Sequence, residues 1–430
     1  MNLFKFFLLA TCLMSLAGIH AQTIQNTGPV KVEVRKIDSS WQLLRGGQPY
    51  FVKGAGGSNY PDRIADYGGN SIRTWGTGDA KRTLDSASKY GLTVLLGLDV
   101  SSERHGFNYD DEAAVKKQLG RLHEEVMKYK NHPALLAWGI GNELNLQYKN
   151  PKVWDAVNEI SKMIHQADPY HPTTTILAGV NKGLVDYIKA RTTDIDLLCI
   201  NTYAGLAGLP HALRQSGWDG PYLVTEWGPT GHWEGLQTAW KSPIEETSSE
   251  KAAVYKSRYE YGVEEDLDKC LGSYVFLWGQ KQERTPTWYG MFTEKGEESE
   301  VVDVMQYLWS GNWPKNKAPH IYSLQIDHKK AVRNVYLKPD TEYNTLAVAT
   351  DPDDDKLSYR WELLPEATKL GDGGDFEARP RSVKGLLTPG SAGHAVIKAP
   401  AEEGAYRLFV YISDGNNHIA TANIPFYVKK

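Results

Sequence analysis

The stretch Trp138-Gly-Ile-Gly-Asn-Glu-Leu144 decides the fold, because it continues an apolar run from Ala134 and ends on a carboxylate at Glu143. A second stretch, Tyr222-Leu-Val-Thr-Glu-Trp-Gly228, has the same form and ends on Glu226. Short apolar runs bounded by glycine predict strands that are buried on both faces, as in a parallel sheet. Each of these two strands therefore delivers one glutamate at its C-terminal end.

Strand-like and helix-like segments alternate between residues 30 and 309, which is the pattern of a parallel sheet with helical crossovers. Amphipathic segments with apolar residues at helical spacing separate the strands, at 111–129, 153–166 and 250–264 among others. Eight strands are expected, at residues 50–56, 71–75, 92–98, 134–140, 173–178, 196–203, 222–226 and 273–278. Eight strand and helix repeats predict a (β/α)8 TIM barrel, whose active site lies at the C-terminal ends of the strands.

A doubly wound open sheet is the competing fold. The glycine-rich stretch Gly54-Ala-Gly56-Gly57-Ser58 lacks the third glycine and the helix start of a phosphate-binding fingerprint, so the barrel is favoured. A hairpin is expected just before the first barrel strand, around residues 41–48.

The periodicity changes after Trp313-Pro-Lys-Asn-Lys-Ala-Pro319, which is typical of a linker. Short alternating strands and turn clusters follow, and the segments 406–412 and 418–424 predict a hairpin. Residues 320–430 therefore predict an all-β, immunoglobulin-like sandwich without the stabilising disulfide.

The first 21 residues have the pattern of a signal peptide, with Lys5, an apolar run and Ile19-His20-Ala21 before Gln22. The apolar run is too short to span a bilayer, and Cys12 lies too early for a typical lipoprotein signal. A secreted, periplasmic or cell-surface protein is expected. The expected organisation is a signal peptide at 1–21, a barrel with its hairpin at 22–312, a linker at 313–319 and a sandwich at 320–430.

The composition of the 430 residues is that of an ordinary soluble globular chain, with 41% hydrophobic and 23% charged residues. The net charge of −4 is not the excess of positive charge that is typical of nucleic-acid-binding proteins. The 13 Trp and 24 Tyr residues suit the apolar faces of sugars as well as protein cores. Cys199 and Cys270 lie in apolar runs, so both are expected to be buried thiols.

Cleavage of a glycosidic bond needs one carboxylic acid that protonates the leaving oxygen and a second carboxylate at the anomeric carbon. Glu143 and Glu226 end the fourth and seventh expected strands, and in a barrel both face the same mouth. The alternative is that each is an ordinary solvated loop glutamate. Glu234 and Glu283 are rival carboxylates, but neither ends a buried strand.

With Asn142-Glu143 and Thr225-Glu-Trp-Gly228 in place, residues 40–310 resemble the clan A glycoside hydrolases, a group of retaining barrel enzymes. The resemblance implies that Glu143 is the acid/base, Glu226 the nucleophile and Asn142 a ligand of the sugar 2-hydroxyl. It also implies that no cofactor is needed.

The same resemblance implies further contacts around the glutamates. Arg73, at the end of strand two, would keep the nucleophile ionised, and Tyr203, at the end of strand six, would touch it. Trp278, at the end of strand eight, would form the floor of a sugar subsite. A structural salt bridge is the alternative for Arg73, and a packed core position is the alternative for Trp278.

Strand seven and the loop after it add Trp227, His232 and Trp233 as candidate sugar contacts. A solvated loop position is the alternative for His232. No second histidine at ligand spacing supports a metal site here.

Departures from the pattern bear on the family. Asn201-Thr202 precede Tyr203 where family 5 enzymes carry His-x-Tyr, which argues against family 5. Cys199-Ile-Asn-Thr-Tyr203 is closer to family 2 barrels, although no family 2 sandwich domains precede the barrel. A barrel directly after a signal peptide and before an immunoglobulin-like domain is similar to family 158, a set of secreted endo-β-1,3-glucanases.

The resemblance thus implies a secreted retaining endo-β-glycosidase that hydrolyses β-1,3-glucan. The expected substrate is a polysaccharide or oligosaccharide, and a monomer is expected. An exo-acting β-glycosidase of family 2 type and a non-catalytic glycan-binding surface protein are the alternatives. Asp351-Pro-Asp-Asp-Asp355 resembles a calcium loop, but Lys356 stands where that loop needs glycine. A hairpin turn with solvated acids is expected there, and a weak calcium site between sandwich loops stays open.

Overall fold

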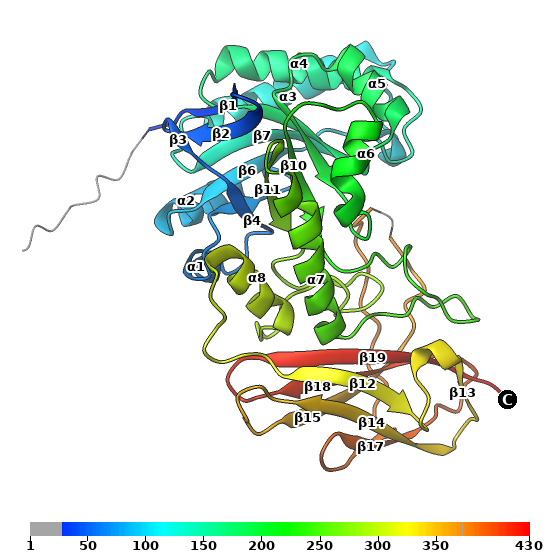
Figure 1. Ribbon diagram of the computed structural model, residues 1–430. Coiled ribbons are helices and arrows are strands. Elements are labelled where there is room, and N and C mark those ends of the chain that lie inside the picture. The colour runs from blue at the N-terminus through cyan, green and yellow to red at the C-terminus, as the bar shows by residue number, and fades with distance from the viewer. Residues whose placement is uncertain (1–27, 372) are drawn as a thin grey trace, which may run out of the picture.

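The computed structural model describes residues 28–371 and 373–430, so the signal peptide expected at 1–21 lies outside the described residues. Figure 1 shows two parts, a barrel wrapped in helices and a β-sandwich that lies against one side of it and ends the chain. Within the described ranges, no helix is both long and apolar enough to cross a membrane.

Eight parallel strands close into a barrel in which each strand pairs with the next one in the chain, and the last with the first. This confirms the predicted TIM barrel. The strands are β4 (Val52–Gly56), β5 (Ser71–Arg73), β6 (Thr93–Leu98), β7 (Leu135–Asn142), β8 (Thr173–Ala178), β9 (Leu197–Asn201), β10 (Tyr222–Trp227) and β11 (Cys270–Val275).

The helices cover the outside of the barrel with one apolar face each. In α3 (Glu112–Tyr129) the buried Leu122 and Val126 lie one helical turn apart, and Asp111 caps the first turn. The remaining helices are α1 (Pro61–Asp66), α2 (Ala80–Lys89), α4 (Lys152–Ala167), α5 (Lys182–Arg191), α6 (Leu209–Gln215), α7 (Ser248–Gly262) and α8 (Glu300–Ser310). The helices expected at 111–129, 153–166 and 250–264 correspond to α3, α4 and α7.

A small antiparallel sheet precedes the barrel, formed by β1 (Val32–Ile37), β2 (Ser40–Arg45) and β3 (Gln48–Pro49). Its Val32 and Leu43 belong to one buried cluster with side chains of the barrel strands such as Leu95 and Leu136. The backbone of Val32 also donates a hydrogen bond to the carbonyl of Tyr170, three residues before the start of β8. The hairpin therefore covers the N-terminal end of the barrel and leaves the other end for a site.

Two four-stranded sheets form the C-terminal domain around a separate apolar core, which confirms the predicted sandwich. One sheet has the order β12 (His320–Ile326), β14 (Glu342–Thr350), β17 (His394–Lys398) and β16 (Leu387–Pro389). The other has the order β13 (Val335–Leu337), β19 (Ile419–Val428), β18 (Gly404–Ser413) and β15 (Ser358–Pro365). The hairpin expected near 406–424 is β18 and β19, and the thiols of Cys199 and Cys270 are free and buried as expected.

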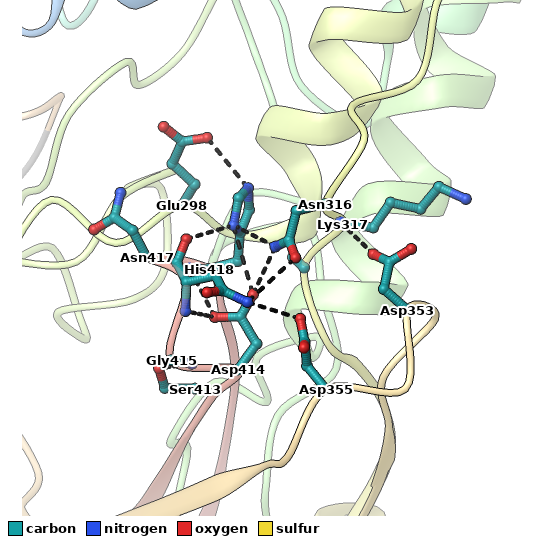
Figure 2. Close-up of polar contacts among 12 residues, drawn as sticks. Glu298, Asn316, Lys317, Asp353, Asp355, Ser413, Asp414, Gly415, Asn417 and His418 are labelled. Carbon is teal, nitrogen blue, oxygen red and sulfur yellow. Dashed lines mark hydrogen bonds and ion pairs between the residues drawn. The ribbon is translucent and has the colours of Figure 1, made fainter.

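The segment between the two parts has no helix or strand at 313–319, yet hydrogen bonds hold it in place. Asn316 donates to the Asp414 carboxylate (2.7 Å), and the backbone of Lys317 donates to Asp353 (2.7 Å). Figure 2 shows His418 of the β18–β19 turn between Asn316 and Glu298, which precedes α8. The barrel, the connecting segment and the sandwich therefore meet in one polar cluster.

Candidate active site

A cavity of about 330 Å³ opens at the C-terminal ends of the barrel strands, at the low end of the range for small-molecule sites. Both glutamates singled out from the sequence face it. The lining residues are Trp75, Asn142, Glu143, Tyr203, Glu226, Trp233, Phe276, Leu277, Lys281, Glu283, Gly373 and Gly374.

The end of β7 has an unusual backbone. Glu143 has a φ of 50°, in the left-handed region, two residues after Gly141 with a φ of 71°. Such a conformation costs a non-glycine residue about 1–3 kcal/mol. A hydrogen bond from the Glu143 backbone to the carbonyl of Ile176 on β8 (2.9 Å) helps to hold it. The strand thus stops at Asn142, and Glu143 lines the cavity.

Three donors converge on the carboxylate of Glu226. Arg73 and the indole N–H of Trp75 both donate to Oε1 at 2.7 Å, and the Tyr203 hydroxyl donates to Oε2 at 3.0 Å. Glu226 is only 6% exposed and Arg73 only 1%. The buried carboxylate of Glu226 thus has a paired opposite charge and three hydrogen bonds.

Glu143 lies in a different environment. Burial and the nearby charge of Glu226 raise the pKa of Glu143 to about 7, while a hydrogen bond from Asn201 (2.9 Å) and the charge of Arg73 oppose this rise. A carboxyl group with such a pKa keeps its proton near neutral pH and is able to give it away. The two glutamates are therefore suited to different tasks.

A polar network connects the two carboxyl groups. Asn142 accepts hydrogen bonds at its side-chain oxygen from Arg73 (2.5 Å) and from Asn201 (3.3 Å), and these two residues also bond Glu226 and Glu143. The amide of Asn142 is fixed in this way at the cavity wall. The structure thus brings together five residues that were singled out from the sequence: Glu143, Glu226, Arg73, Asn142 and Tyr203.

Two predicted sugar contacts lie elsewhere. Trp278 is 0% exposed and packs on Trp309 at 5.3 Å, because β11 ends at Val275 and not at residue 278. Trp227 is also 0% exposed and faces Tyr255 of α7, because successive strand residues point to opposite faces and Glu226 occupies the inward position. The prediction that these two tryptophans contact substrate is therefore corrected, since both belong to the core.

The loop after β10 contributes Trp233 to the cavity wall, with 57% of the residue exposed. His232 is not among the lining residues. Its ring packs edge-on against Trp233 and accepts a hydrogen bond from Arg284 (3.2 Å). His232 thus supports Trp233 and does not reach the cavity. The rival Glu234 also stays outside, because it accepts backbone hydrogen bonds from Gly231 and Ala204.

Sequence reasoning missed several residues of the cavity. Trp75 follows Arg73 by two positions, and the period of two in an extended chain was a signal that both share a face. Glu283, named from the sequence only as a rival carboxylate, lines the cavity and pairs with Lys281 (2.7 Å), and burial raises its pKa. No local signal identified Gly373 and Gly374, which come from the sandwich.

One group of acidic side chains within residues 28–371 and 373–430 has oxygens close enough to hold a metal ion. Asp351, Asp355 and Asp414 lie in the sandwich, with ligand atoms within 4.8 Å of one another, and none of them lines the barrel cavity. Asp351 accepts backbone hydrogen bonds from Asp353 (2.9 Å) and Asp355 (3.1 Å), which is the geometry of the expected turn. Figure 2 shows Asp355 and Asp414 in this cluster, and we assign no ion to it.

Comparison with known proteins shows which proteins the barrel is similar to. The sequence model of the glycosyl hydrolases family 2 TIM barrel domain matches residues 64–245. A β-glucuronidase from Chlorocebus aethiops is 21% identical over 201 residues, which are 41% of this chain and 28% of that protein. A probable mannan endo-1,4-β-mannosidase C from Aspergillus terreus is 26% identical over 165 residues, covering 32% of this chain and 40% of that protein.

Among solved structures, a β-glucuronidase from Faecalibacterium prausnitzii superimposes with a TM-score of 0.52 at 20% identity, over 65% of this chain and 52% of that chain. This likeness shows the fold. The chain spans less than half the length of the curated relatives it matches. The barrel and the matched family model together make this part of the chain similar to the TIM barrel domain of family 2 glycosyl hydrolases.

Proposed function

We propose that the protein is a retaining β-glycosidase of family 2 type that removes sugar units from the ends of β-linked substrates. The observation that carries this proposal is the unequal environment of two glutamates in one cavity. Arg73, Trp75 and Tyr203 donate to the carboxylate of Glu226, whereas burial raises the pKa of Glu143 to about 7. One group is prepared to attack and the other to donate a proton.

The proposed reaction has two steps. In the first, Glu226 attacks the anomeric carbon while Glu143 gives its proton to the leaving glycosidic oxygen, and a glycosyl ester on Glu226 results. In the second, the Glu143 carboxylate takes a proton from water, the oxygen of this water attacks the anomeric carbon, and Glu226 leaves as a carboxylate. Glu143 is then protonated again, so no cofactor takes part in the scheme.

The sugar is proposed to be neutral. Among the described residues that line the cavity, Lys281 is the only cation, and its Nζ lies 2.7 Å from the Glu283 carboxylate. A uronic acid would need a positive charge that is not already paired. Although one relative and one structural neighbour carry the name β-glucuronidase, we therefore expect glucosides, galactosides or mannosides to be better substrates.

Exo action agrees with the family 2 match better than the endo action expected from the sequence. The similar proteins named above act, by name, on glucuronides and mannan, so β-1,3-glucan as the substrate rests on domain order and glutamate spacing alone. We keep it as a narrower proposal about the polymer from which units are removed. Export and a monomeric state are likewise proposed from the sequence.

A panel of p-nitrophenyl β-glycosides and laminarin tests the proposal. We expect one or more neutral glycosides to be cleaved, single sugars to be released, and the first product seen by NMR to be the β anomer. Glu143→Ala should lower kcat by about 10²–10⁴-fold for substrates with poor leaving groups. Glu226→Ala should abolish turnover, and azide should restore it by forming an α-glycosyl azide in the vacated space.

Glu234→Gln serves as the matched control, because this carboxylate lies on the loop after β10 but outside the cavity. It should retain activity within a few-fold. An α anomer as the first product would contradict the double displacement, and a ladder of oligosaccharides would favour endo action. Binding of glucans without turnover of any of them would favour the non-catalytic alternative.

A further inference from the structure

The connection between β15 and β16 of the sandwich, residues 366–386, is unusually long. It exceeds the ~12–15 residues beyond which a loop in a compact domain generally has a function. In Figure 1 this connection, coloured orange, rises from the sandwich towards the barrel. Gly373 and Gly374 of this connection line the same cavity as Glu143 and Glu226.

The part of the connection at 373–377 is fixed to the barrel by ion pairs. Asp375 pairs with Arg104 (3.1 Å), which lies in the loop after β6. Glu377 pairs with Arg284 (3.2 Å), which lies after β11, and its carboxylate also accepts the backbone N–H of Arg284 (2.7 Å). Glu377 is only 3% exposed, so this contact is an interior one. The segment therefore contacts the connections that follow β6 and β11, the third and eighth strands of the barrel.

The two glycines fit closely against the barrel. Both have a positive φ, 55° for Gly373 and 80° for Gly374. A Cβ on Gly373 would meet Leu146, three residues after Glu143, at 3.1 Å, and a Cβ on Gly374 would meet Lys281 at 3.2 Å. Lys281 also donates a hydrogen bond to the carbonyl of Gly374 (3.0 Å). The backbone itself thus forms one wall of the cavity.

We infer that residues 373–377 of the sandwich are a specificity-determining wall of the substrate site that restricts it to the ends of sugar chains. This inference rests on the proposed β-glycosidase function and refines it. A chain bound across an open cleft extends on both sides of the cleaved bond, whereas a fixed wall beside the two glutamates leaves no path on its side. The sandwich is then part of the active site and more than a spacer.

Two variants test the wall. Asp375→Ala combined with Glu377→Ala removes both carboxylate anchors, and replacement of residues 373–376 by one glycine withdraws the wall but keeps Glu377. In each we expect KM for a p-nitrophenyl β-glycoside that the native protein cleaves to rise about tenfold, the loss of one modest contact. We also expect internal cleavage of a β-linked oligosaccharide, seen as products longer than one sugar.

Asp340→Ala is the matched control, because it removes an exposed pair with Lys398 (3.3 Å) elsewhere in the same sandwich. It should change neither KM nor product size. If the shortened variant melts at the native temperature and yet keeps the native KM and releases only single sugars, the inference is wrong. The shortened variant decides the matter if the double variant does not fold.

A binding experiment distinguishes a failure of the proposed function from a failure of the inferred wall. Trp75 and Trp233 line the cavity, so their fluorescence should report methyl β-glycosides of glucose, galactose and mannose. Binding by a native protein that cleaves nothing would refute the function, and weaker binding by the shortened variant would still support the wall. Equal binding by both proteins, or binding by neither, would overturn the inference.

Discussion

The pH dependence of the proposed reaction depends on one hydrogen bond that can be removed. Asn201 donates from Nδ2 to Oε1 of Glu143 at 2.9 Å, and this bond favours the charged form of Glu143. The proposed acid must hold its proton in the first step. The upper limb of the profile of kcat/KM against pH should therefore lie near pH 7, where the pKa of Glu143 lies.

Asn201→Ala should move this limb to higher pH. A hydrogen bond to a charged group contributes about 1.5–3 kcal/mol, and one pKa unit corresponds to about 1.4 kcal/mol. The full loss of the bond would thus raise the pKa of Glu143 by about 1–2 units. Because Asn201 is only 3% exposed, water will replace its amide incompletely, and we expect a shift of about one unit.

The assay is kcat/KM for one aryl β-glycoside across the pH range, repeated with a leaving group so acidic that it needs no proton. The upper limb should be present with the first substrate and weak with the second. Thr225→Val is the control, because it removes the donor to Oδ1 of Asn201 (2.9 Å) and leaves the bond to Glu143 in place. An upper limb that stays unmoved in Asn201→Ala would refute the role of Glu143 as the acid.

The remaining predictions concern packing and stability. Trp233→Ala should raise KM without changing the melting temperature, because Trp233 is 57% exposed at the cavity. Trp278→Ala should lower the free energy of unfolding by about 3–5 kcal/mol, because Trp278 is fully buried. It should leave KM unchanged in the folded protein. Lys251→Met should destabilise the protein by about 3–5 kcal/mol in chemical denaturation, because it leaves Glu245 buried without its direct ion-pair partner at 2.6 Å. Burial raises the pKa of Glu245, but Lys251 and the hydrogen bonds outweigh burial and lower it. The pair therefore stabilises the native protein at neutral pH, and this contribution falls as the pH drops through the lowered pKa, so the difference between the two proteins should shrink in acid.

Much of the barrel could be predicted from the sequence because its signals are local. Apolar runs such as the one at 134–140 alternate with amphipathic helices. A glutamate at the end of a barrel strand lies at the C-terminal end of the barrel, whatever conformation the loops adopt. The misplacement of Trp278 has an equally local cause. The eighth strand starts at Cys270, three residues before the expected start, and so ends before the tryptophan is reached. Strand ends are the least certain part of such a prediction, and site residues depend on them.

The wall at 373–377 could not be found in this way. Its contacts with Arg104 and Arg284 join positions more than 90 residues apart, and neither glycine is part of a recognisable motif. They depend on how the sandwich docks on α7, where the backbone of Ile321 donates to Ser249 and that of Thr421 donates to Ser248, both at 2.9 Å. Docking of this kind is decided by tertiary packing and has no periodic signal.

The division of roles between the two glutamates is also a property of the folded environment. Both Glu143 and Glu226 are glutamates at the C-terminal end of a buried strand, so strand position alone does not separate them. What separates them is that Arg73, 1% exposed, pairs directly with Glu226 and reaches Glu143 only at longer range. Exchange of the roles would require the buried guanidinium to pair directly with Glu143 and not with Glu226. If Arg73→Met left the upper limb of the pH profile and the rate of glycosyl transfer to Glu226 as they are, this account of the division would fail.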